Sequence, residues 1–119
     1  MLRFDVDQQF VSPPMTIQAE HLSPRFGASA GRVGYLSFGA ASRLAISTDG
    51  FGEEVSLTGE ENWSAVTNVA VGDRVTVRTT VFDIDCRTGE DIIRCVRQVV
   101  DDQGEIVMTG SAAFFPRPA

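Results

Sequence analysis

The sequence contains no lysine, and all ten of its basic residues are arginines, against sixteen Asp and Glu. The formal net charge is −6 and the isoelectric point is about 4.6. Binding to nucleic-acid phosphates needs a basic surface, so this balance argues against a nucleic-acid partner. Single arginines remain candidates for an anionic ligand, because the guanidinium can bind a phosphate or carboxylate through two hydrogen bonds.

Long apolar runs are also missing. The N-terminal MLRFDVDQQF is polar and acidic, unlike a secretory signal peptide. No stretch approaches the roughly 20 apolar residues that a membrane-spanning helix needs. We therefore expect a cytoplasmic protein that has no membrane segment.

Cysteine and histidine are scarce, with two cysteines and one histidine in the chain. A hairpin centred on Thr88-Gly89 would place Cys86 opposite Asp91 rather than opposite Cys95. We therefore expect two free, buried thiols and no disulfide. The spacing of these residues is not that of a metal site, and we expect neither a metal nor a cofactor.

The 119 residues have the length and composition of one globular domain, 1–119. Its C-terminal half predicts strands over 74–85, 91–100 and 105–115, because apolar and β-branched residues alternate with polar ones between short polar turns. Residues 54–67 predict a further strand, bent or bulged near Gly59. A further short strand is predicted near the N-terminus, over 4–11.

The segment 34–46 (GYLSFGAASRLAI) predicts a largely buried helix. Leu36, Ala40 and Leu44 recur at i, i+4 and i+8, and small residues between them would let a helix approach a sheet closely. A helix followed by long antiparallel strands predicts an α+β fold, in which a curved sheet wraps a long central helix.

This order of elements resembles the hotdog fold, and several motifs resemble those of MaoC-like dehydratases. The motifs are NVAVGDRV at 68–75, VDDQGEIV at 100–107, GYLS at 34–37, and the opening segments FDV at 4–6 and MTI at 15–17. The resemblance covers nearly the whole chain and extends to hotdog acyl-CoA thioesterases. It implies a dimer, in which edge strands pair into a continuous sheet and the ligand site lies at the interface.

The departure from that family is informative. Catalytic MaoC-like hydratases carry a Gly-Asp-x-Asn-Pro-x-His segment before the central helix, which supplies the acid and base for chemistry on an acyl thioester. Here the chain runs from Ala19-Glu20-His21-Leu22 directly into Ser23-Pro24-Arg25. Hydration needs an acid–base pair within hydrogen-bonding reach of the substrate, and the sequence has only one histidine.

Two residues are candidates for catalysis. His21 follows Glu20, but adjacent side chains usually point apart, so a surface or loop histidine is the alternative. Gly34 is expected at the start of the helix, where its backbone N–H would polarise a thioester carbonyl, as the resemblance implies. The alternative for Gly34 is a glycine that the turn into the helix requires.

A thioesterase would need a carboxylate on or near the central helix. Residues 35–46 contain none, and Ser42-Arg43 stands where one would be expected. The acids after the helix, Asp49 and Glu53-Glu54, are typical of solvated turns.

Four further residues are candidates for substrate binding. Tyr35, Phe38 and Trp63 would line an acyl tunnel or, alternatively, pack in the core. Arg97 would bind a coenzyme A phosphate or form an ordinary ion pair; Arg94 lies on the opposite face of the same strand.

Three functions remain open. The first is a MaoC-like protein that handles acyl thioesters of coenzyme A or acyl carrier protein, related to enoyl-CoA hydratases and dehydratases, either as a homodimer or as the non-catalytic subunit of a heteromer. The second is a hotdog acyl-CoA thioesterase or a repurposed biosynthetic enzyme. The third is a hotdog protein that binds a ligand without catalysis. Fold alone does not decide among them.

Overall fold

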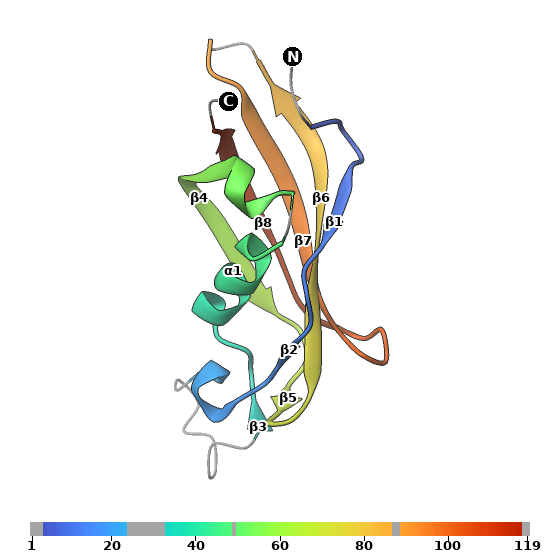
Figure 1. The fold of residues 1–119 in the computed structure, drawn as a ribbon. Helices are drawn as coiled ribbons and strands as arrows, with labels where there is room; N and C mark the ends of the chain where they lie inside the picture. Colours follow the sequence, from blue (N-terminus) through green and yellow to red (C-terminus); the bar gives the residue numbers. More distant parts are fainter. Residues whose placement is uncertain (1–3, 24–32, 49, 87–88, 118–119) are drawn as a thin grey trace.

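An antiparallel sheet and one short helix dominate the computed structural model, which describes residues 4–23, 33–48, 50–86 and 89–117 (Figure 1). The sheet has the order β1-β6-β7-β8-β4, and β2 also pairs with β6. Its strands are β1 (Gln9–Val11), β2 (Met15–Thr16), β4 (Val55–Ala65), β6 (Arg74–Asp85), β7 (Ile92–Asp101) and β8 (Ile106–Pro116). A separate ladder joins β3 (Val33–Gly34) and β5 (Val69–Ala70), and the helical elements are α1 (Phe38–Ile46) and the 3-10 turns η1 (Ala19–His21) and η4 (Gly52–Glu54).

The long C-terminal strands confirm the predicted meander. In β6, alternate residues are buried on the face toward α1, among them Val75, Val77 and Val81. The predicted irregularity near Gly59 is also confirmed, because the register of β4 against β8 shifts between Leu57 and Glu61. The bulge matters below because it determines where Glu61 lies.

The helix is shorter than predicted and begins later. Ser37 caps its N-terminus by accepting a hydrogen bond from the Ala40 backbone N–H at 3.2 Å, so α1 starts at Phe38 and has nine residues. Leu36 is buried as its spacing predicted, yet it lies in an extended segment that pairs with Leu22. The expectation of a long central helix is therefore not confirmed.

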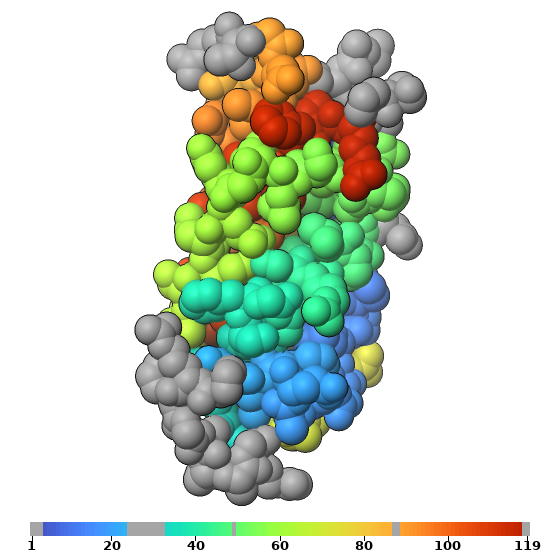
Figure 2. Space-filling view, turned by 90° about the vertical axis from the view of Figure 1, so that its left-hand side faces the viewer, coloured from blue at the N-terminus to red at the C-terminus, as the bar shows by residue number. Residues whose placement is uncertain are grey.

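The helix lies across one face of the sheet, and its other side is exposed in the single chain (Figures 1 and 2). Ala41, Leu44 and Ala45 face inward and are buried. Phe38 and Ile46 remain 50% and 43% exposed. One long side of the helix is thus left without a covering element in the described chain.

Two groups of buried side chains form the core on this face of the sheet. One lies beneath α1 and includes Ile17, Leu36, Leu44, Trp63, Val77, Val99 and Met108. The other, called here the phenylalanine cluster, contains Phe4, Phe51 and Phe114 with Phe10 packed against them. Its rings meet mostly edge to face, with the centroids of Phe51 and Phe114 5.0 Å apart.

Both cysteines are free, as predicted, but only one is buried. Cys95 lies in β7, and burial raises the pKa of its thiol to about 12. Cys86 is exposed just beyond β6, which corrects the expectation of two buried thiols. Asp91 faces it as predicted, and a hydrogen bond to that carboxylate raises the pKa of Cys86. Within the described residues, no helix has the length and apolar character needed to cross a membrane.

Candidate functional site

A polar network lies between α1 and the sheet, on a face that is otherwise mostly apolar. It consists of Ser42, Glu61, Trp63 and Arg97, and it is called here the inner polar network. Trp63 of β4, Gly110 of β8 and Arg97 of β7 occupy neighbouring register positions across three adjacent strands. The strand register, rather than closeness in sequence, therefore brings these residues together.

Gly110 makes room for the network. A Cβ atom at this position would come within 2.2 Å of the Asn62 carbonyl oxygen and 2.7 Å of the Trp63 ring. Because this position carries no side chain, the Trp63 ring can lie against Gly110, and the Arg97 guanidinium stacks on the ring with its central carbon 4.0 Å from the ring centroid.

Hydrogen bonds link the four side chains. The Ser42 hydroxyl donates to Glu61 Oε2 at 2.7 Å and accepts from Trp63 Nε1 at 2.9 Å. Arg97 Nη2 donates to the same Glu61 oxygen at 2.9 Å. Glu61 thus joins the middle of α1 to the centre of the sheet.

The charge of Arg97 is enclosed. The residue is 1% exposed, and burial lowers the pKa of its guanidinium, although Glu61 opposes this shift. Nε and Nη1 find no hydrogen-bond acceptor in the parts of the chain that the structure describes. The neighbouring Thr79 Oγ1 on β6 is likewise buried without a partner there. Buried polar atoms of this kind are rare in native proteins.

The structure brings together two of the predicted site residues, Trp63 and Arg97, and adds two that sequence reasoning missed. A thioesterase would need a carboxylate on or near the helix; residues 35–46 contain none, and Glu61 brings one to Ser42 from β4. The bulge at Gly59 was the available signal, because a bulge redirects the side chains that follow it. For Arg97, the ion pair considered as the alternative to phosphate binding is present.

His21 lies beside the start of the helix. Its imidazole Nδ1 accepts a hydrogen bond from the Gln18 backbone N–H at 2.9 Å, which closes the η1 turn. Its carbonyl oxygen accepts from the Ser37 backbone N–H at 2.8 Å. One ring nitrogen is therefore engaged in local structure, and a catalytic role for His21 stays a prediction.

Gly34 does not lie at the helix N-terminus, which corrects its predicted placement. It belongs to β3, where it pairs with Val69. Tyr35 follows in the extended segment, and its carbonyl accepts from the Ser23 backbone N–H at 2.7 Å. Phe38 is the first residue of α1 and is half exposed, so it does not pack in the core.

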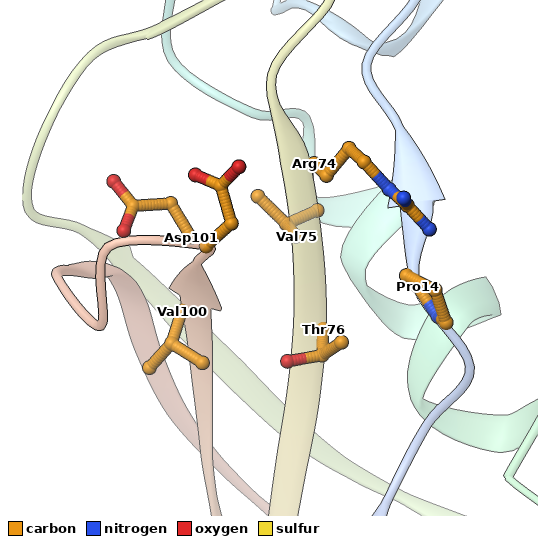
Figure 3. A pocket seen from close by; sticks show the side chains of 7 residues that line it. Pro14, Arg74, Val75, Thr76, Val100 and Asp101 are labelled. Carbon is orange, nitrogen blue, oxygen red and sulfur yellow. The ribbon is translucent and has the colours of Figure 1, made fainter.

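A hollow elsewhere on the molecule contains none of the predicted site residues (Figure 3). It lies where β6 meets the turn after β7, and Pro14, Arg74, Val75, Thr76, Val100, Asp101 and Asp102 line it. The Asp101 carboxylate serves the turn, because Oδ1 accepts from the Gln103 and Glu105 backbone N–H groups, both at 2.9 Å. The described residues contain no group of His, Cys, Asp and Glu suited to a metal ion.

Comparison with known proteins gives matches in structure alone. No protein-family model and no curated protein matches the sequence. The R-hydratase PhaJ1 from Pseudomonas aeruginosa is similar with a TM-score of 0.73 and 16% identity, over 98% of this chain and 84% of that one.

Two further solved structures are similar over most of both chains. A MaoC-like dehydratase from Rhodospirillum rubrum has a TM-score of 0.67 at 19% identity, over 98% of this chain and 96% of that one. The protein smu.793 from Streptococcus mutans UA159, solved with acetyl-CoA bound, has a TM-score of 0.64 at 12% identity, over 96% of this chain and 86% of that one. The chain therefore has the hotdog fold that these structures share.

Proposed function

We propose that this chain binds acyl thioesters as a MaoC-like hotdog protein related to enoyl-CoA hydratases and dehydratases, and that it is the non-catalytic subunit of a heteromer. The likeness to an R-hydratase and to a MaoC-like dehydratase supports the acyl-thioester ligand. The observation that carries the non-catalytic role is the position of His21. It is the only histidine of the chain, and its Nδ1 closes a 3-10 turn.

A second subunit has a surface available to it. β4 ends the sheet order, so one of its edges pairs with no other described strand. Leu57 on this strand is 45% exposed, and Phe38 and Ile46 on the helix are similarly uncovered. If a strand of the second subunit paired with this edge, it would supply hydrogen-bond partners for the backbone of β4 and bury these side chains. The partner would contribute the acid and the base.

The test is hydration of crotonyl-CoA by the purified chain, measured together with binding of the same thioester by calorimetry. We expect binding without hydration. Robust hydration by the isolated protein would contradict the non-catalytic role. In that case His21→Asn is the informative variant, since its side-chain oxygen can accept from Gln18 as Nδ1 does while the imidazole is lost. Absence of any binding would contradict the acyl-thioester function itself.

A second candidate, a thioesterase, is favoured by the carboxylate of Glu61 at the middle of the helix. In this reaction Glu61 accepts a proton from water, the water oxygen attacks the thioester carbonyl carbon, and the thiolate leaves and takes up the proton. Its test is thiol release from acyl-CoA, with Glu61→Gln as the variant that loses it. A Cys86→Ser background removes the exposed thiol that would otherwise react with the thiol reagent. If no thiol is released, this candidate is excluded.

A further inference from the structure

The position of Arg97 is not explained by the needs of the fold. Its neighbours on the inner face of β7, Cys95 and Val99, are buried and apolar. A buried ion pair generally contributes little to stability compared with well-packed apolar residues of similar volume. A charged side chain that is 1% exposed at the centre of this face therefore requires another explanation.

The guanidinium has fewer partners than it can hold. Nη2 donates to Glu61 at 2.9 Å and approaches the Ser111 carbonyl oxygen at 3.4 Å. Nε and Nη1, which together carry three N–H bonds, have no acceptor in the described chain. Leaving buried donors unpaired is costly, so an acceptor from outside the chain would be bound favourably.

The partner of Arg97 is held less firmly than Arg97 itself. Glu61 has a side chain that is 25% exposed, whereas that of Arg97 is fully enclosed. It follows the bulge at Gly59, whose φ of +105° shows a local departure from regular strand geometry. The Glu61 carboxylate can therefore leave the guanidinium by a side-chain rotation at the surface.

We propose that Arg97 is the binding site for a carboxylate carried on the acyl group of the thioester ligand, and that Glu61 occupies this site in the free protein. The inference rests on the proposed acyl-thioester function and adds the class of acyl group. Arginine suits this role because its planar fork matches a carboxylate and its charge strengthens the hydrogen bonds. The Trp63 ring lies beneath the guanidinium, with its centroid 4.0 Å from the central carbon, so the site for the carboxylate has an apolar side chain next to it.

The experiment compares matched pairs of thioesters by calorimetry on the full chain at constant salt. Succinyl-CoA is paired with butyryl-CoA and adipyl-CoA with hexanoyl-CoA, so that each pair differs in one terminal carboxylate. We expect the carboxylated member of at least one pair to bind about 10-fold or more tightly, as a charge-assisted hydrogen bond of about 1.5–3 kcal/mol implies. Binding of free succinate is measured as well, to separate recognition of a carboxylate alone from recognition of a carboxylated thioester.

Variants sharpen the test because they act in opposite directions. Arg97→Met should remove the preference within the pair. Glu61→Gln should strengthen binding of the carboxylated thioester, since the competing carboxylate loses its charge. Arg94→Met is the matched control, because Arg94 lies on the same strand but pairs with Asp83 and Asp85. It should leave the preference unchanged.

Three outcomes would overturn the proposal. Equal affinity within both pairs would show that Arg97 does not bind the terminal carboxylate of the acyl group. Succinate that binds as tightly as succinyl-CoA would place the carboxylate outside a thioester ligand. A Glu61→Gln variant with weakened binding would show that Glu61 assists the ligand rather than competing with it. If Arg97→Met fails to fold, the wild-type pairs and Glu61→Gln still decide. If no thioester binds at all, the proposed function fails first, so the two failures are distinguishable.

Discussion

The phenylalanine cluster and the inner polar network lie on the same face of one sheet, yet they are built in opposite ways. The first is formed by buried aromatic rings whose edges meet neighbouring faces, with Phe51 and Phe114 both fully enclosed. The second encloses a guanidinium with two nitrogens that lack acceptors in the described chain. The difference teaches that one region stabilises the fold, whereas the other costs free energy, which in our proposal a bound ligand offsets.

Removing an aromatic ring from the phenylalanine cluster should have the largest effect on stability. Phe114→Ala should lower the free energy of unfolding by about 3–5 kcal/mol, because it deletes a fully buried ring and leaves a cavity. Phe82→Ala is the control, since Phe82 is 48% exposed, and it should change stability far less. Urea denaturation measures both, and similar losses would contradict the assignment.

A methyl group at Gly110 should disturb the inner polar network. Gly110→Ala should cost about 1–3 kcal/mol, since the new atom meets the Asn62 backbone and the Trp63 ring. Gly39→Ala is the matched control in the exposed part of α1, where a Cβ meets nothing within 4 Å and alanine favours the helix. The same denaturation measurement should show the two variants moving in opposite directions.

Loss of the buried charge should matter little for folding. The double variant Arg97→Met/Glu61→Gln should leave the free energy of unfolding within about 1 kcal/mol of the wild type or raise it, because replacing both partners of the ion pair leaves neither charge uncompensated. A loss as large as that of Phe114→Ala would show that the ion pair is needed for the fold. The contrast between the two regions would then disappear.

The buried thiol should give a smaller, pH-dependent effect. Burial raises the pKa of Cys95 from its ordinary value of 9.0 to about 12, so the native thiol stays protonated where the unfolded one ionises. The contribution to stability is therefore present below pH 9 and is lost as the pH rises toward 12. Cys95→Val should flatten the pH dependence of unfolding above pH 9. Parallel curves for variant and wild type would contradict the shift.

Much of the sheet could be predicted because apolar and polar residues alternate along each strand, and this pattern is visible among neighbouring residues. Val75, Val77 and Val81 alternate with polar residues, and the structure buries them. The start of the helix could not be placed from spacing alone. Leu36 satisfies the helical spacing and is buried, but it is buried from an extended segment. The capping residue Ser37 was the better signal.

The inner polar network was only half predictable. Trp63 and Arg97 stood out as a single tryptophan and an arginine on a strand, but their contact depends on register across β8. Glu61 was missed because its partner is 36 residues away in sequence. A bulge can be predicted from Gly59, whereas the direction in which it sends the next carboxylate depends on the packing of the helix.

The indole N–H of Trp63 gives the most direct test of the claim that ligand binds at the inner polar network. It is the only tryptophan of the chain, and its Nε1 donates to Ser42 at 2.9 Å, so it reports on this site alone. We predict that titration with an acyl-CoA moves the single indole signal in a ¹H–¹⁵N spectrum in step with binding measured by calorimetry. An indole signal that stays in place while the thioester binds would contradict the account.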